Sequence, residues 1–347
     1  RDGAVVHEAA YGYKDVTSKS ILKVNDIFYI QSMTKPIVSV AFMMLYEQGH
    51  FSLSDPLAKY LPEFKNLKVI ENVETGITGN TVALEKDITI LELLTHTSGF
   101  THAIGESRFD KEVQKEYYMK NWPDINSQVN SIPDLPLMAQ PGQAWNYSFS
   151  PDILSVLIEH FSGMSTLEYL TKNIFEPLDM KDTGYNLSKD QQSRVVKAHV
   201  KDSIGILGHL ENQAKVEGNT IWSGTHGLFS TPQDYMNFCQ MLLNNGSWNG
   251  HHLLSRKTIE LMTANHVGNL FFRPGEGFGL GFAVITDTPA TNQLGSDGVF
   301  YWAGAYNTHF FIDPHEKLIS IFMTQLAPFT FYYHDKMRQL VYPAIID

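Results

Sequence analysis

Apolar positions recur at intervals of three and four residues in several segments of the chain, which is the pattern of helices with one buried face. The predicted helices span residues 32–48, 88–95, 151–163, 165–176, 231–245 and 329–343. Glycines end several of them, as Gly49 and Gly163 do, because glycine readily adopts the left-handed conformation that follows a helix. The sequence therefore predicts that helices fill most of the middle of the chain.

Strand-like patterns lie towards the two ends. Residues 4–13 follow the turn pair Asp2-Gly3, and further strands are predicted over 278–286, 307–313 and 317–325. Residues 100–140 are polar and irregular, which predicts a lid or a pocket wall. The expected fold class is mixed α/β: an antiparallel sheet built from both termini and flanked by helices, with a mainly helical lobe inserted. One domain, 1–347, would comprise a sheet-containing lobe, 1–55 and 220–347, and a helical lobe, 56–219.

Composition narrows the classes of function. The chain has 347 residues, 43% of them hydrophobic, and its net charge is −11 from 37 acidic and 26 basic residues. Nucleic acid is not an expected partner, because phosphate binding needs clustered Lys and Arg and no basic run occurs. The single cysteine, Cys239, excludes a disulfide within the chain and is expected to be a small buried residue on a helix.

The cellular compartment stays open between cytoplasmic and periplasmic or secreted. No apolar run approaches the ~20 residues needed to span a bilayer, so a soluble protein is expected. No signal peptide is visible. The chain begins at Arg1 without an initiating Met, which favours a processed or trimmed product.

The stretch Ile-Gln-Ser-Met-Thr-Lys-Pro at residues 30–36 places Ser32 and Lys35 three apart at a helix start. Ser32 as a helix cap and Pro36 in the first turn are ordinary choices. Lys35 is not, because a cation there opposes the helix dipole. Residues three apart share a helix face, so a Lys with a lowered pKa could activate the Ser hydroxyl as a nucleophile. The short motif alone leaves both interpretations open.

Other chemistry has less support. The repeat Gly275-x-Gly277-x-Gly279-x-Gly281 lacks the Gly-Lys-Ser/Thr ending of a phosphate loop. No Gly-x-Ser-x-Gly, His-Glu-x-x-His or cysteine pair occurs, so neither a cofactor nor a metal is expected. The adjacent histidines at 251 and 252 are predicted to form a solvated turn.

Five segments, taken in order, resemble the serine β-lactamase-like superfamily, specifically its branch of class C β-lactamases and family VIII carboxylesterases. The resemblance covers nearly the whole chain. The segments are Ser32-Met33-Thr34-Lys35-Pro36, Leu93-Leu94-Thr95-His96-Thr97-Ser98-Gly99, Tyr147-Ser148, Gly227-Leu228-Phe229-Ser230-Thr231 and Trp302-Ala303-Gly304. It implies a β-lactamase/transpeptidase-like fold.

The resemblance also implies roles. Ser32 would be the acylating nucleophile, Lys35 its activator, and Tyr147 the proton relay, with a pKa lowered by the neighbouring ammonium. The N–H groups of Ser32 and Ala305 would form the oxyanion hole. Gly304 would let the backbone approach the substrate closely.

Two departures from the family pattern bear on the substrate. Trp302 stands where β-lactamases usually carry Lys or His to meet the substrate carboxylate, and Phe149 replaces an Asn that helps hold the β-lactam side chain. Both changes replace polar anchors with apolar surface and favour neutral esters. His226 is a further candidate for the pocket lining, whereas His96 is expected to organise its loop rather than act as a base.

The expected function is therefore a serine carboxylesterase that acts on small neutral esters through an acyl-enzyme, with transesterification possible. The alternatives are a β-lactamase or D-amino-acid peptidase, and a binding protein that kept the fold without catalysis. The expected partner is a small-molecule ester, with no nucleic acid and no metal. The oligomeric state is open.

Overall fold

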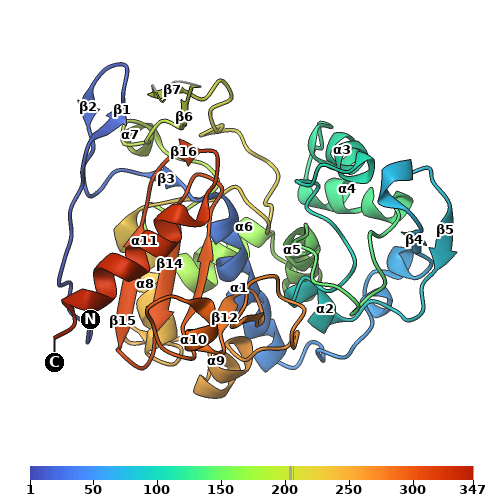
Figure 1. The fold of residues 1–347 in the computed structure, drawn as a ribbon. Coiled ribbons are helices and arrows are strands. Elements are labelled where there is room, and N and C mark those ends of the chain that lie inside the picture. The colour runs from blue at the N-terminus through green and yellow to red at the C-terminus, as the bar shows by residue number, and fades with distance from the viewer. Residues whose placement is uncertain (203–204, 206, 347) are drawn as a thin grey trace.

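A five-stranded antiparallel sheet organises one half of the molecule in this computed structural model, which describes residues 1–202, 205 and 207–346 (Figure 1). The strands lie side by side in sequence order: β11 (Glu276–Phe278), β12 (Ala283–Ile285), β13 (Phe300–Ala303), β14 (His309–Asp313) and β15 (Leu318–Phe322). All five strands come from the last quarter of the chain, so the mixed α/β fold is confirmed, but a sheet built from both termini is not.

The predicted strand over 4–13 is wrong. The residues from Ala4 to Gly12 form no strand, and Val5 and Val6 are 65% and 73% exposed. Near the N-terminus the chain touches the β14–β15 turn, where Asp2 N–H donates to Lys317 O at 3.0 Å. The first strand, β1 (Tyr13–Asp15), pairs instead with β2 (Ser20–Ile21), because a local turn closes that hairpin without help from the sheet.

The single strand predicted over 278–286 is two strands. Gly281 has φ +95°, a left-handed conformation that interrupts an extended chain, and Gly279 N–H donates to Phe282 O at 2.8 Å. β11 and β12 therefore pair with each other as a hairpin. The predicted strands over 307–313 and 317–325 correspond to β14 and β15, with the expected turn between them.

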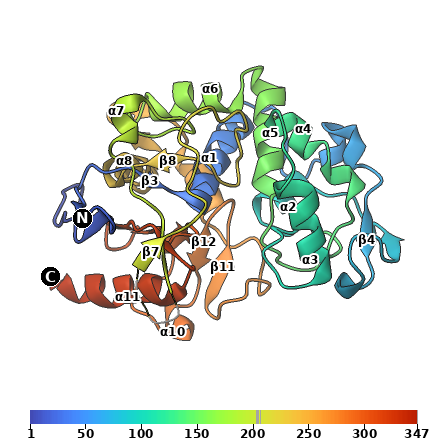
Figure 2. The same ribbon diagram turned by 90° about the horizontal axis from the view of Figure 1, so that it is seen from above.

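Helices cover both faces of the sheet, as Figure 2 shows. On one face α11 (Phe331–Val341) places His334 against Tyr301, with ring centroids 4.6 Å apart. On the other face lie α1 (Thr34–Glu47) and α8 (Pro232–Leu243), whose Tyr235 ring is 5.1 Å from that of Phe310. Alternate side chains of β13 and β14 thus enter two separate apolar clusters.

The other half of the molecule is mainly helical and lies beside α1, which packs against α5 (Ser150–Ser162; Figure 1). Its elements are α2 (Ile90–Leu94), α3 (Arg108–Val113), the π-helical η5 (Gln114–Tyr118), α4 (Ile125–Val129), α5 (Ser150–Ser162) and the hairpin of β4 (Lys68–Ile70) and β5 (Thr81–Ala83). The prediction of an irregular segment over 100–140 is wrong in part. Short helices form there because Ser107 and Asp124 cap their N-termini with side-chain hydrogen bonds.

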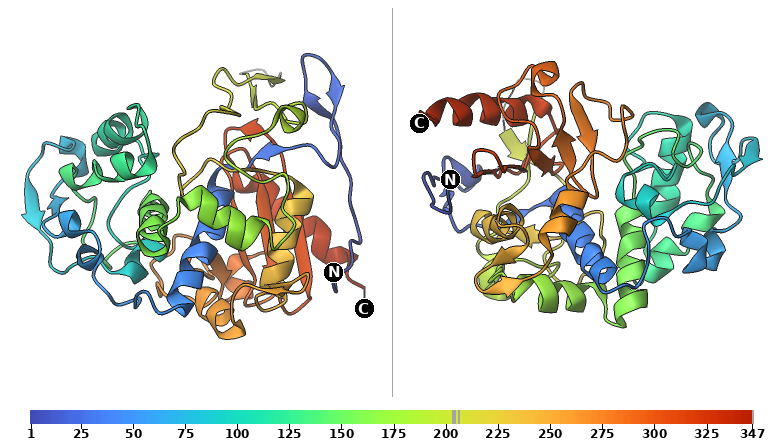
Figure 3. Two further views of the ribbon diagram at one scale, coloured as in Figure 1. Left: turned by 180° about the vertical axis from the view of Figure 1, so that it is seen from behind. Right: turned by 90° about the horizontal axis from the view of Figure 1, so that it is seen from below.

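The elements after Gly163 lie on the sheet side of the molecule (Figure 3). They are α6 (Thr166–Leu170), the π-helical η7 (Thr171–Phe175), α7 (Lys189–Gln192), β6 (His199–Lys201) and β7 (Leu207–His209). β6 pairs in parallel with β16 (Leu326–Ala327), which follows the sheet. We therefore propose that the helical lobe ends near Gly163 rather than at residue 219.

Short elements complete the fold. They are β3 (Phe28–Tyr29), β8 (Phe229–Ser230), β9 (Ser247–Trp248), β10 (His251–His252), α9 (Arg256–Met262), α10 (Thr288–Thr291) and the 3₁₀ turns η1 (Gln31–Met33), η2 (Leu57–Lys59), η3 (Pro62–Phe64), η4 (Val73–Thr75), η6 (Ile132–Asp134) and η8 (Tyr342–Ala344). Cys239 is buried on α8 as predicted, and the exposed histidines of β10 belong to a hairpin. Among the described helices, none combines the length and the apolar character needed to cross a membrane.

Candidate active site

Ser32 and Lys35 meet at the junction of η1 and α1. Lys35 Nζ donates to Ser32 Oγ at 3.2 Å and to the backbone oxygen of Thr225 at 2.9 Å. The backbone of Ile30, two residues before Ser32, is anchored by its N–H to Leu228 O at 3.0 Å. No side-chain capping hydrogen bond forms at the start of η1 or α1, so the helix-cap interpretation of Ser32 is wrong.

The environment of Lys35 favours its neutral amine. The side chain comes from the buried face of α1 and the residue is 1% exposed. Burial lowers the pKa of Lys35 well below its ordinary value, and the carboxylate of Asp152 opposes this by raising it. An amine whose pKa is lowered by burial and that lies 3.2 Å from a serine hydroxyl has the position of a general base.

Tyr147 lies on the other side of the same amine. The Lys35 Nζ atom is 4.4 Å from the centroid of the Tyr147 ring. The phenol is close enough to Ser32 and Trp302 for both side chains to lower its pKa, but its hydroxyl reaches hydrogen-bond geometry with no described residue. Burial is the larger effect and raises the pKa of Tyr147. The expectation of a pKa lowered by the neighbouring ammonium is therefore wrong for the free protein, because the effect of burial outweighs the groups that lower the pKa.

The loop that carries Tyr147 is fastened to His96. The Nδ1 atom of His96 accepts a hydrogen bond from Ser148 N–H at 3.2 Å and lies 2.9 Å from Ser148 Oγ, while His96 O accepts from Asn146 N–H at 2.9 Å. An Nδ1 lone pair that accepts a backbone N–H is not available to take a proton from a substrate. His96 thus organises its loop, as the sequence predicts.

The end of β13 is pressed against the turn that carries Ser32. A Cβ atom on Gly304 would lie well inside van der Waals contact with the Ile30 carbonyl oxygen and Thr308 Oγ1. Glycine is therefore required here for the close approach of two protein segments, rather than for the predicted approach of substrate. Ala305, the predicted second oxyanion donor, is the next residue and is exposed. The contact between Gly304 and Ile30 therefore holds Ala305 near the N-terminus of η1.

The predicted substrate-binding residues divide into two groups. Trp302 is half-buried, and its ring centroid lies 5.4 Å from that of Tyr147. β12 pairs with β13 only up to Tyr301, so Trp302 lies beyond the end of that pairing. His226 is half-buried, with Nδ1 3.4 Å from Tyr29 OH. Burial lowers the pKa of His226, although the carboxylate of Asp152 opposes this shift. Phe149, in contrast, is 2% exposed and stacks on Tyr117 in the core, so the structure does not bring it to the site.

His102 is a site residue that the sequence did not indicate. Its Nε2 atom lies 3.4 Å from Lys35 Nζ, and its ring stacks on that of Tyr147 at 4.8 Å. On its far side Nδ1 is 3.3 Å from Tyr118 OH. Burial, and then the nearby Lys35, hold the pKa of His102 well below its ordinary value. Its segment carried no recognisable motif, so nothing in the pattern singled it out.

Asp152 holds the segment that accepts a hydrogen bond from Lys35. Its carboxylate accepts hydrogen bonds from Tyr117 OH at 2.8 Å, Ser223 Oγ at 2.6 Å and Thr225 N–H at 2.9 Å. Thr225 in turn supplies the carbonyl that accepts from Lys35. An acidic residue in the first turn of α5 suits the helix dipole, and that preference was the available sequence indication.

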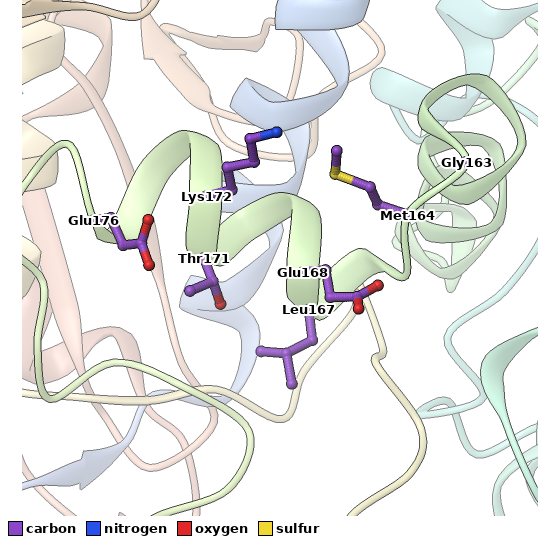
Figure 4. A pocket seen from close by; sticks show the side chains of 7 residues that line it. All are labelled: Gly163, Met164, Leu167, Glu168, Thr171, Lys172 and Glu176. Atoms are coloured by element: carbon purple, nitrogen blue, oxygen red, sulfur yellow. The ribbon is translucent and has the colours of Figure 1, made fainter.

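A shallow surface depression lies apart from these groups, along α6 and η7 (Figure 4). It is lined by Gly163, Met164, Leu167, Glu168, Thr171, Lys172 and Glu176. None of the predicted site residues lines it.

Comparison with known proteins agrees with the fold and with the sequence resemblance. Rv1367c of Mycobacterium tuberculosis is 30% identical over 330 residues, which cover 91% of this chain and 82% of that protein. Esterase EstB of Burkholderia gladioli is 25% identical over 94% of this chain and 84% of its own. Among solved structures, EstCE1, a hydrolase with promiscuous acyltransferase activity, superposes with TM-score 0.83 at 21% identity, covering 99% of this chain and 91% of its own.

Simvastatin synthase LovD of Aspergillus terreus has the same fold, with TM-score 0.75 at 22% identity over 91% of this chain and 84% of its own. The family model described as Beta-lactamase matches residues 1–341, nearly the entire sequence. The chain therefore belongs to the beta-lactamase family.

Proposed function

We propose that this protein is a serine carboxylesterase that hydrolyses small neutral esters through an acyl-enzyme. The observation that carries the proposal is the buried Lys35 amine, 3.2 Å from Ser32 Oγ and directly below the ring of Tyr147. Three groups with the chemistry of a nucleophile, a base and an acid thus share one buried centre. A protein that kept the fold only for binding has no need for this arrangement.

In the first step Ser32 Oγ attacks the ester carbonyl and Lys35 takes the hydroxyl proton. The backbone N–H groups of Ser32 and Ala305 stabilise the oxyanion, a contribution of about 10²–10³ in rate for each donor. The ester C–O bond then breaks, and the alcohol leaves with a proton from Tyr147. A raised pKa keeps that phenol protonated in the free protein, as a general acid requires.

In the second step water attacks the acyl carbon and gives its proton to the Tyr147 phenolate, while the bond to Ser32 Oγ breaks. The carboxylic acid is released, and Ser32 regains its proton from Lys35. An alcohol that takes the place of water gives transesterification, which is consistent with relatives named as acyltransferases in Penicillium and Aspergillus.

Trp302 supports an ester rather than a β-lactam as substrate. It cannot ionise, so it offers no cation to a substrate carboxylate, and its ring packs edge-on against the buried Phe278 with centroids 5.3 Å apart. The relatives named as esterases, EstB and a lovastatin esterase of Penicillium rubens, point the same way. A β-lactamase or D-amino-acid peptidase is the second candidate, favoured by the family match alone.

The test is parallel hydrolysis of a short-chain p-nitrophenyl ester and a chromogenic cephalosporin by the wild type, Ser32→Ala and Ser52→Ala. Ser52 is an exposed serine outside the site and serves as the matched control. We expect ester turnover in the wild type and in Ser52→Ala, its loss in Ser32→Ala, and little cephalosporin turnover. Dominant cephalosporin turnover would overturn the argument from Trp302, and ester turnover that persists in Ser32→Ala would overturn the nucleophile.

A further inference from the structure

Two histidines and an aspartate meet far from Ser32, where the hairpin of β1 and β2 contacts β6 and β7. His199 and His209 are direct partners in the register of β6 and β7, so both side chains stand on one face of that ribbon. Asp15 comes from the end of β1, about 180 residues earlier in the chain. One ligand atom from each of the three side chains lies within 4.8 Å of the other two.

We propose that Asp15, His199 and His209 form a binding site for a divalent transition metal, with Zn²⁺ as the best match. Imidazole nitrogen and carboxylate oxygen are the ligands that zinc takes in proteins, and three such ligands leave a fourth, open position for water. This site is independent of the proposed esterase chemistry. It revises the expectation of a protein without a metal, which rested on sequence motifs alone.

The three groups are already oriented. Asp15 Oδ1 accepts hydrogen bonds from Thr17 N–H at 2.8 Å and Ser18 N–H at 3.2 Å, which fix the carboxylate plane. His209 Nε2 lies 2.8 Å from the same oxygen. The Ser18 hydroxyl also lies close enough to the carboxylate to help lower the pKa of Asp15, so the turn at residues 17–18 holds this ligand in place. Carboxylates held in this way by neighbouring N–H groups are typical of metal sites.

The ring arrangement is also compatible with one shared ion. The centroids of His199 and His209 are 5.4 Å apart and the rings are tilted by 51°, so they are not stacked face to face. Val16 N–H points at His199 Nε2 from 3.3 Å, a long hydrogen bond that a metal on this nitrogen would replace. The competing interpretation is a metal-free cluster, in which His209 donates to Asp15 and nothing else binds.

The metal would act as a clip between segments distant in sequence. β1 has β2 as its strand partner, and β6 and β7 join the rest of the molecule through β16. An ion bound by all three residues would tie the hairpin of β1 and β2 to strands β6 and β7. Its main effect is therefore on the stability of the folded protein, because a ligand that binds only the folded state stabilises it by mass action.

The test is titration of the full chain, freed of metal by a chelator, with ZnCl₂ in a calorimeter and in thermal unfolding. The variants are Asp15→Asn, His209→Gln and, as the matched control, the doubly substituted His251→Gln/His252→Gln, which removes an exposed histidine pair elsewhere. We expect one Zn²⁺ per chain and a raised unfolding midpoint in the wild type and the control. Asp15→Asn and His209→Gln should weaken binding at least about tenfold.

Co²⁺ provides a second readout that does not depend on stability, since its visible absorption reports nitrogen and oxygen ligation in a low-coordinate site. The absorption should appear in the wild type and the control but not in His209→Gln. Zinc binding that is absent in the wild type, or that keeps its wild-type affinity in both site variants, would overturn the proposal. Wild-type circular dichroism in every variant would exclude misfolding as the cause.

Discussion

Two buried basic side chains lie on opposite faces of the sheet, and each lies over a tyrosine ring. Lys35 of α1 is 1% exposed with its Nζ 4.4 Å from the centroid of Tyr147, and Arg338 of α11 is 0% exposed with its guanidinium carbon 5.0 Å from that of Tyr301. Lys35 donates to Ser32 and Thr225. For Arg338, no described residue accepts from any of its three side-chain nitrogens.

The difference lies in what burial can do to each group. An ammonium loses its proton when it is buried, and the neutral amine is a base, whereas a guanidinium keeps its charge in proteins. Next to Arg338, the shifted pKa values belong to the neighbouring histidines. Burial, together with the charge of Arg338, holds the pKa of His309 and His334 well below the ordinary value. In the proposed mechanism, Lys35 rather than Arg338 takes part in catalysis because its pKa can be lowered and it lies beside the nucleophile.

The largest expected effect comes from exchanging the two cations. Lys35→Arg should lower kcat/KM for a short-chain ester by about 10³, because a permanently charged side chain cannot take the proton of Ser32. Arg338→Lys should leave kcat/KM within about threefold of wild type, since Arg338 contacts no reacting group. Steady-state kinetics on both variants decide the comparison. A Lys35→Arg protein with more than a tenth of wild-type activity would show that Lys35 is not the base.

The next largest effect concerns the acid. Tyr147→Phe removes the hydroxyl but keeps the ring below which Lys35 lies, so kcat should fall by about 10²–10³ with little change in KM. Tyr301→Phe is the matched control on the other face, and its kcat should stay near the wild-type value. A Tyr147→Phe protein with wild-type kcat would remove the phenol from the mechanism.

The backbone contact behind the site gives a smaller effect, on stability. Gly304→Ala would force a methyl group against the Ile30 carbonyl oxygen, and we expect the free energy of unfolding to fall by about 1–3 kcal/mol. Gly184→Ala is the control, because a Cβ there would meet its nearest atom, Asn186 O, at an ordinary 3.5 Å. Denaturant unfolding measures both. Equal stabilities for the two variants would contradict the tight packing of β13 on the Ser32 turn.

The smallest effect is a dependence of stability on pH. The pKa of Lys35 is lowered in the folded protein, so between that lowered pKa and 10.5 the unfolded chain binds a proton that the folded protein does not. Stability should therefore rise with pH between the lowered pKa and about pH 10.5. Lys35→Met lacks this linkage and should be the more stable protein at pH 7, by an amount that shrinks as the pH approaches 10. A constant difference between the two proteins across that range would show that Lys35 stays charged when folded.

The sequence predicted the elements whose pattern is local. The helices that contain Lys35 and Cys239 follow from the spacing of apolar residues, and the order of short motifs predicted that Ser32, Lys35 and Tyr147 meet. The prediction of a single strand over 278–286 is wrong because one residue in the left-handed conformation, Gly281, divides it. A regular pattern of side chains does not reveal such a break.

The rest of the site depends on contacts between distant segments. His102 and Asp152 enter through packing and carry no motif of their own, and the burial of Phe149 is decided by its stacking on Tyr117. The raised pKa of Tyr147 likewise follows from burial, which overrides the nearby amine. Such properties arise only once the chain has folded.

The central claim is that Ser32 is a nucleophile activated by the neutral amine of Lys35. Reaction with a p-nitrophenyl alkylphosphonate, followed by intact mass and peptide mapping, tests it without assuming the natural ester. The account predicts one adduct per chain, on Ser32, formed at least about 100-fold more slowly in Lys35→Arg. An adduct on another residue, no adduct at all, or labelling of Lys35→Arg at the wild-type rate would contradict it.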